Sequence, residues 1–263
     1  MEDLSHYNPE GSVMRKTQLR LLEILDVFDG ICRKHHIDYW LDCGTLLGAR
    51  RHGGFIPWDD DFDVCILHSD YKKLVSVLEK ELPENLKLQT RETDKKYYYY
   101  FPRIRDTRSR LHNKRGAIFE YNGIFFDIFL IEPVPSIKFK KSMDNFLRSK
   151  ILFKKTKSLH YKCKFAIMYC FLPLIHIIIK SLRVYYKYNK SSKHLYDRVY
   201  GLISCSTYHI EEILPVNEIM FEGKKYKAPR CIDKYLINQF GTSYMELPKV
   251  ADRYSHASEV EFL

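Results

Sequence analysis

Apolar residues recur at helical spacing along residues 13–36, with charged residues between them, and this pattern predicts a long amphipathic helix. Residues 37–42 form a short apolar and aromatic run that predicts a strand. Gly44 and Thr45 break this run, and we expect a helix over residues 46–51 that ends at Gly53 and Gly54.

Further apolar runs predict strands at residues 62–67, 97–104 and 124–131, the last ended by Glu132 and Pro133. Between the first two we expect a helix over residues 70–80 with Ser69 as its N-cap. Because strand and helix patterns mix along one chain, the pattern favours an α+β fold, a mixed sheet flanked by helices.

The pattern changes in the second half of the chain. Residues 139 to about 200 are basic, rich in tyrosine and helical in spacing. We expect a hairpin over residues 218–227 that turns at Glu222 and Gly223, and a short helix over residues 232–240 that Gly241 stops. We therefore predict one domain over residues 1–263, with a basic helical insertion at about 138–200 and a C-terminal closing unit at about 215–256.

The charge is local. The whole chain has a net charge of +10, but residues 137–193 alone hold fifteen Lys and Arg and a single acid, Asp144. The remainder is therefore net acidic, which argues against a general nucleic-acid binder, and we expect no nucleic-acid partner. The seven cysteines contain no CxxC pair, and the first residues lack the apolar core of a secretory signal. We expect a reduced, cytoplasmic protein.

Four carboxylates, at positions 59, 60, 61 and 63, stand at the start of the predicted strand 62–67. Side chains alternate along a strand, so Asp61 and Asp63 face the same way, and a divalent cation such as Mg²⁺ relieves the repulsion between them. The alternative is an acidic turn that caps the strand, but such a turn does not require Asp63 inside an apolar run.

Asp127 lies inside another apolar strand pattern and is the candidate third carboxylate. A lone buried charge is expensive unless it is paired or binds a metal. The alternative to a metal is a salt bridge to a buried arginine, Arg103 or Arg105.

Gly44 and Thr45 stand where a strand passes into a helix, and the amide groups of a helix N-terminus bind phosphate oxygens. Arg51 and His52 end the same helix. They either neutralise a diphosphate or simply satisfy the helix dipole. Arg103 and Arg105 share one face of a strand end and are further candidates for phosphate contact.

These residues resemble the LicD family of phosphotransferases, which is similar to the DNA polymerase β-like nucleotidyltransferases and, more distantly, to fukutin-type proteins. Cys43 stands where that family has glycine. The resemblance covers roughly residues 13–131 and 215–256, through three stretches of sequence: residues 37–63 with Trp58-Asp59-Asp60-Asp61-Phe62-Asp63, residues 123–129 with Gly123-Ile124-Phe125-Phe126-Asp127, and residues 240–248, followed by Arg253 and His256.

The resemblance implies transfer of phosphocholine or a polyol phosphate from a CDP-linked donor, such as CDP-choline, to a sugar hydroxyl of a cell-surface glycan, including lipid-linked acceptors. Teichoic acid, lipopolysaccharide and capsule are glycans of this kind. It implies two Mg²⁺ ions held by Asp61 and Asp63, with Asp127 on the acceptor side. CMP would leave, stabilised by Gly44, Thr45 and Arg51, while Asp59 orients a ligand.

Two other functions stay open. One is a nucleotidyltransferase that moves a nucleotide to a small acceptor. The other is a non-catalytic protein of the same fold at a membrane surface, against which the intact set Asp61, Asp63 and Asp127 argues.

Residues 165–179 are apolar apart from His176 and contain Pro173. They fall short of the roughly 20 residues that a membrane span needs. They form either a kinked core helix or a helix on the anionic inner face of a membrane, with lysines toward the headgroups. The tyrosine run at 97–100 is a candidate sugar or choline site, although we favour a plain strand there.

Overall fold

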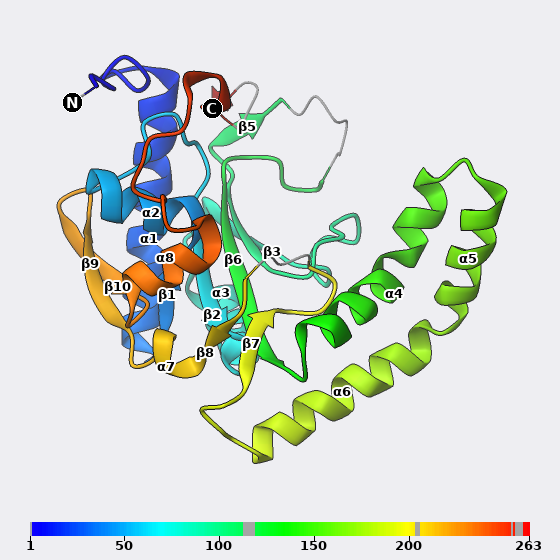
Figure 1. The fold of residues 1–263 in the computed structure, drawn as a ribbon. Helices are drawn as coiled ribbons and strands as arrows, with labels where there is room; N and C mark the ends of the chain where they lie inside the picture. The colour runs from blue at the N-terminus through cyan, green and yellow to red at the C-terminus, as the bar shows by residue number, and fades with distance from the viewer. Residues whose placement is uncertain (1, 113–118, 203–205, 254, 256–259) are drawn as a thin grey trace. The chain divides into compact units, whose positions relative to one another are not determined.

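A computed structural model of the protein describes residues 2–112, 119–202, 206–253, 255 and 260–263 (Figure 1). The chain forms two compact units, one made of Met1–Leu130 with Glu212–Leu263 and the other of Ile131–Glu211. The predicted basic insertion lies inside the second unit. The mixture of helices with a mixed sheet confirms the α+β prediction.

The first unit is built on five neighbouring strands in the order β1-β2-β6-β4-β3. Their bounds are Tyr39–Leu41 for β1, Asp63–Leu67 for β2, Phe125–Val134 for β6, Arg103–Asp106 for β4 and Leu86–Gln89 for β3. β1 pairs antiparallel with β2, and β4 lies antiparallel to β6 with Arg103 opposite Asp127. A separate pair joins β5 (Ser109–Leu111) to β11 (Val260–Phe262). This order places β2 and β6, the two strands with candidate carboxylates, side by side.

The long helices described in the first unit are α1 (Val13–Lys34), α2 (Cys43–His52), α3 (Tyr71–Glu81) and α8 (Ile232–Phe240). Short 3₁₀ turns, η1 (His68–Asp70) and η2 (Val250–Asp252), complete it. α1 starts at Ser12, whose hydroxyl accepts the amide of Arg15, and its apolar face includes the fully buried Phe28. Phe28 packs on Phe126 of β6, and Phe126 stacks on Phe62 with ring centroids 5.1 Å apart. The core therefore lies between α1 and the strands that present the acids.

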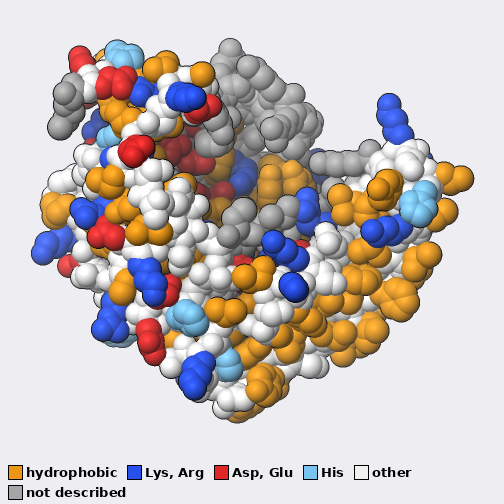
Figure 2. Space-filling view, viewed as in Figure 1, with side chains coloured by type: hydrophobic (Ala, Val, Ile, Leu, Met, Phe, Trp, Pro, Cys, Tyr) orange, Lys and Arg blue, Asp and Glu red, His pale blue; other side chains and the backbone are white. Residues whose placement is uncertain are grey.

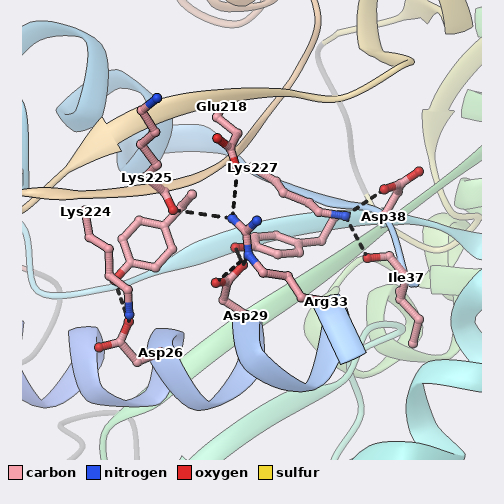
Figure 3. Close-up of polar contacts among 11 residues, drawn as sticks. Asp26, Asp29, Arg33, Ile37, Asp38, Glu218, Lys224, Lys225 and Lys227 are labelled. Atoms are coloured by element: carbon pink, nitrogen blue, oxygen red, sulfur yellow. Dashed lines mark hydrogen bonds and ion pairs between the residues drawn. The ribbon is translucent and has the colours of Figure 1, made fainter. Parts of the chain in front are cut away.

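The predicted C-terminal hairpin is confirmed as β9 (Asn217–Phe221) and β10 (Lys224–Ala228). Glu222 and Gly223 both adopt positive φ, +49° and +80°, as a tight two-residue hairpin turn requires. Figure 3 shows how this hairpin is fastened to α1 and the turn after it. The ion pairs are Lys224 with Asp26, Arg33 with Glu218, and Lys227 with Asp38. These contacts explain why the two ends of the chain belong to one unit.

The second unit contains α4 (Ile137–Lys155), α5 (Leu159–Cys170) and α6 (Leu172–Tyr188), followed by β7 (Leu195–Arg198) and β8 (Tyr208–His209). α7 (Ile210–Ile213) leads back into the first unit. The last residues of β6 pair antiparallel with β7, and β7 pairs with β8. Two ion pairs hold α4 and α6 inside this unit. The buried Lys140 pairs with Asp144 on the same helix and also donates to the carbonyl of Leu202, and the partly exposed Arg183 pairs with the buried Glu132.

Three local predictions are wrong. Ser69 lies in η1, and α3 begins after Asp70 without a side-chain cap. Residues 97–101 are not strand, because Tyr97 donates its amide to the Asp94 carbonyl and its hydroxyl to the Phe101 carbonyl, which closes a local turn. β6 does not stop at Pro133, which pairs with Tyr196 of β7. Among the described strands β7 is the only neighbour there, and proline is tolerated at such an edge.

The apolar segment 165–179 breaks at Phe171, between α5 and α6, and Pro173 lies in the first turn of α6. In the part of the chain that the structure describes, no single helix is both long and apolar enough for a membrane span. Within those described residues, α5 and α6 taken together, across a bend of 51°, reach that length and apolarity.

Candidate active site

The site begins where β2 and β6 lie side by side. The amide of Asp127 donates to the carbonyl of Phe62 across 2.9 Å, and Asp63 follows directly. The two carboxylates come from neighbouring strands and are both buried, with exposed fractions of 8% for Asp63 and 5% for Asp127. Asp59 and Asp61, in the loop before β2, are partly exposed. The site therefore combines two buried acids with two that solvent or a ligand can reach.

The Gly44–Thr45 turn lies against the start of β2. The hydroxyl of Thr45 accepts the amide of Asp63 at 2.9 Å, and the amide of Asp42 donates to the Asp63 carbonyl at 3.0 Å. A Cβ atom at Gly44 would lie 2.6 Å from Oδ2 of Asp59, so the absence of a side chain lets the acidic loop approach the helix N-terminus. The structure thus brings together the turn that the sequence suggested for phosphate and the acids that it suggested for a metal ion.

Asp42 is a part of this region that the sequence reasoning missed. It caps α2, and its Oδ1 accepts the Cys43 amide, the Tyr235 hydroxyl and the Gln239 amide group. The signal was present, since Asp directly before a glycine-containing helix start is a common N-cap. Cys43 itself has φ +46°, a backbone conformation that glycine adopts more readily than other residues.

Burial and four neighbouring carboxylates raise the pKa of Asp63 well above its usual value. Burial is the largest cause, followed by the charges of Asp61, Asp127, Asp42 and Asp59. The acids therefore lie close enough to repel one another, as a site that receives a cation requires.

Asp127 is held by Arg103, the residue opposite it on β4. Nε of Arg103 donates to Oδ1 of Asp127, and Nη2 donates to Oδ2 at 2.8 Å. Burial raises the pKa of Asp127, whereas Arg103 lowers it. The alternative interpretation from the sequence, a salt bridge to a buried arginine, is thus observed.

Arg103 and Arg105 face protein groups. The Arg103 guanidinium lies in an aromatic cluster, 4.2 Å from the Phe125 ring centroid and 4.7 Å from that of Tyr99. Arg105 donates to the side chain of Gln89 and to the carbonyl of Gly123, and burial followed by the charge of Arg103 lowers its pKa to about 10. In this structure both guanidiniums position the strands around Asp127 and have no contact that points to a phosphate.

Arg51 and His52, at the end of α2, meet the C-terminal segment. Nη1 of Arg51 donates to the carbonyls of Tyr244 and Glu246, and Nε donates to His52. Among the described residues Nη2 of Arg51 has no hydrogen-bond partner. Burial, followed by the charge of Arg51, lowers the pKa of His52 to about 4, so that its ring is neutral at pH 7.

The C-terminal segment around Arg253 also covers the acidic loop. From the sequence, Arg253 was identified only as part of the family resemblance. Arg253 lies over the Trp58 ring, 5.0 Å from its centroid, and Ser255 donates to Asp60. His256 lies outside the described residues. The C-terminal segment therefore packs on the loop that presents the acids.

Comparison with known proteins gives a consistent result. Residues 36–159 match the model of the LicD/FKTN/FKRP nucleotidyltransferase domain. The chain is 28% identical to the lipopolysaccharide cholinephosphotransferase LicD of Haemophilus influenzae, over 92% of this chain and 95% of that protein. It is also 49% identical over 41 residues to the ribitol 5-phosphate transferase FKRP of Homo sapiens, which is 16% of this chain and 8% of that protein.

Residues 36–159 therefore form a LicD-type nucleotidyltransferase domain, and the chain is similar to a LicD protein over nearly its whole length. By this similarity the chain is a phosphotransferase. The matched LicD domain contains both candidate carboxylate strands and the glycine turn, and it ends as α5 begins.

Carboxylates are the candidate ligands for a metal ion in this LicD domain. Among residues 2–112, 119–202, 206–253, 255 and 260–263, no three His, Cys, Asp or Glu side chains are arranged as a finished metal site. The donor chemistry nevertheless fits Mg²⁺, because several carboxylates repel one another around Asp63. Both oxygens of Asp127 accept from Arg103, so this carboxylate would have to share its remaining lone pairs with an ion.

Proposed function

We propose that this LicD-like protein transfers a substituted phosphate, phosphocholine or a polyol phosphate, from a CDP-linked donor to a hydroxyl of a cell-surface glycan. The observation that carries the proposal is the meeting of Asp63 and Asp127 beside the Gly44–Thr45 turn. Carboxylates that activate a hydroxyl and a helix N-terminus that binds phosphate are both needed for this reaction. The named relatives supply the class of group, cholinephosphate or ribitol phosphate.

Residues of this chain supply the groups that act in each step of the proposed reaction. The acceptor hydroxyl forms a bond to the distal phosphorus, the bond from that phosphorus to the diphosphate bridging oxygen breaks, and CMP leaves. Asp127 accepts the hydroxyl proton, and its burial favours the protonated form. The amides at Gly44 and Thr45 and the Nη2 group of Arg51 bind oxygens of the donor diphosphate and stabilise the phosphate of the departing CMP. Asp59, beside Gly44, orients the donor.

Mg²⁺ belongs to the proposal as the expected cofactor, as two ions. Bound to these acids, it would neutralise charge on the attacking and leaving oxygens. Asp61 and Asp63 would hold both ions, and Asp127 would complete the acceptor-side ion. The surplus of carboxylate charge around Asp63 supports this assignment.

The test is incubation of the protein with Mg²⁺, a panel of CDP-linked donors and a soluble oligosaccharide acceptor, with products identified by mass spectrometry. CMP and an acceptor carrying the substituted phosphate are the expected products. Pyrophosphate with a nucleotide-modified acceptor, formed from a nucleoside triphosphate, would instead assign the chain as a nucleotidyltransferase. Absence of any product with every donor would support a non-catalytic protein. Chelation of Mg²⁺ should abolish turnover.

We also propose that the reaction takes place in the cytoplasm, at the inner face of a membrane, with lipid-linked glycans among the acceptors. The net charge of +14 along residues 137–193 supports a position beside anionic lipid. Fractionation of cells into soluble and membrane pools, with and without a high-salt wash, tests it. Recovery of all protein in the soluble pool at low salt would contradict this location.

A further inference from the structure

We propose that the second unit has a specific lipid-docking surface, formed by the outward faces of α5 and α6, which lies along an anionic bilayer without crossing it. The proposal concerns where the protein sits and not which bond it makes, so it can fail while the phosphotransfer proposal stands.

Large hydrophobic side chains are exposed along both helices. Figure 2 shows them gathered along α6 and the adjoining part of α5. α5 has no buried residue at all within its described positions, and its Ile167 is 61% exposed. The exposed set in the two helices and the residue between them is Leu159, Tyr161, Ile167, Tyr169, Phe171, Leu174, Ile177, Val184, Tyr185 and Tyr188. Apolar patches of this kind mark interaction surfaces.

On α6 the exposed apolar residues form one stripe. Leu174, Ile177, Val184 and Tyr188 recur at helical spacing on the outward side, whereas Ile175 and Ile179 are buried. The helix thus has two apolar faces, one packed inside its own unit and one left outward. Only the outward face needs a partner.

The charge pattern identifies a bilayer as that partner. No Asp or Glu occurs between Asp144 and Asp197, while lysines occur throughout the same segment. Lys180 and Lys187 are exposed on α6 beside the apolar stripe. An anionic leaflet attracts Lys180 and Lys187, and its acyl region accepts the apolar side chains beside them.

The contacts of α6 favour a helix that lies on the surface over one that spans. Arg183 holds the buried Glu132 with two hydrogen bonds, of 2.6 and 2.9 Å. Ile175 and Ile179 face protein. A helix that is engaged by its own unit along one side cannot be surrounded by lipid, and α5 and α6 are separated by a bend of 51°.

Flotation of the full-length protein with vesicles tests the surface. Vesicles of phosphatidylcholine with 30% phosphatidylglycerol should bind the protein at low salt and release it at high salt, and pure phosphatidylcholine should bind it at least tenfold more weakly. The triple variant Leu174→Ser, Ile177→Ser and Val184→Ser, and separately Lys180→Glu with Lys187→Glu, should each bind roughly tenfold more weakly. The matched control removes three exposed hydrophobic side chains of the first unit, Val13→Ser, Leu19→Ser and Ile237→Ser, and should bind as the wild type does.

A fluorescent reporter tests contact directly. The two tryptophans of the chain, Trp40 and Trp58, are buried in the first unit, so an Ile177→Trp variant gives a distinct signal. Its emission should shift to the blue on addition of anionic vesicles, whereas a Val13→Trp control should not shift. Absence of binding at any salt overturns the proposal, as does binding that withstands carbonate extraction, which would indicate a span. Lipid-independent dimerisation that the triple serine variant abolishes would assign the surface to a second copy.

Discussion

Strand β6 carries two buried carboxylates that form similar bonds in different units of the molecule. Asp127 accepts two hydrogen bonds from Arg103 in the first unit, and Glu132 accepts two from Arg183 in the second. Their surroundings differ. Asp127 shares its region with Asp63 and other acids, whereas Glu132 also accepts the amide of Tyr200. The comparison shows that an ion pair alone does not mark a site, because the neighbouring acids distinguish the two.

The same contrast separates the two units as wholes. In the first unit, helices and hairpin bury their apolar faces and the acids converge on one place. In the second, one face of α6 is packed and the other is apolar and exposed. We infer that the first unit holds the chemistry and that the second decides where the protein works.

The largest expected effect is on turnover, and it separates the two acids of β6. Asp127→Asn should lower turnover on a soluble acceptor by roughly 10²–10⁴, because an amide does not accept the hydroxyl proton. Glu132→Gln, the matched change in the second unit, should lower it less than about threefold. Initial rates of CMP release measure both, and circular dichroism confirms that each variant is folded. Equal losses in the two variants would mean that Asp127 is structural.

A second prediction compares the two arginines. Arg103→Gln should reduce the free energy of unfolding by about 3–5 kcal/mol, because it leaves a buried carboxylate beside other acids. Arg183 has a side chain that is 38% exposed, and Glu132 keeps the Tyr200 amide, so Arg183→Gln should cost about 1–2 kcal/mol. Urea denaturation monitored by fluorescence and by circular dichroism provides both values. A larger loss for Arg183→Gln would reverse the proposed ranking of the two pairs.

The smallest expected effect is on the pH dependence of stability, through His52 in the first unit. Burial lowers the pKa of His52 to about 4, whereas an unfolded histidine titrates near 6.5. Between these values the unfolded chain binds a proton that the folded chain does not, so His52 makes stability fall as pH drops from about 6.5 to 4. The raised pKa of Asp63 acts in the opposite direction, so the difference between variants is the useful measure.

His52→Asn should therefore lose less of its melting temperature between pH 6.5 and pH 4 than the wild type does. His176→Asn, on the exposed face of α6, is the control and should follow the wild type. Identical pH profiles for His52→Asn and the wild type would show that His52 is not held neutral by the fold.

Local patterns predicted the elements whose signal lies within a few residues. The amphipathic spacing of α1, the Glu222–Gly223 turn and the Gly241 stop after α8 were all found where the sequence indicated. Sequence patterns gave wrong predictions where contacts with residues elsewhere in the chain determined the local structure. The tyrosine run at 97–100 predicts a strand, but Tyr97, Tyr98 and Tyr99 pack into an aromatic cluster with Phe119. Pro133 continues β6 because β7 pairs with it.

The sequence by itself determined the residue types of the site: acids at the start of one apolar strand, another acid inside a second, and a glycine before a helix. It also showed a segment without acids between Asp144 and Asp197. Only the tertiary structure decided that Arg103 holds Asp127, that Asp42 adds to the acidic group, and which side of α6 stays outward. The physical reason is range: helix and turn signals act over a few residues, whereas ion pairs and burial join residues that only the folded chain brings together.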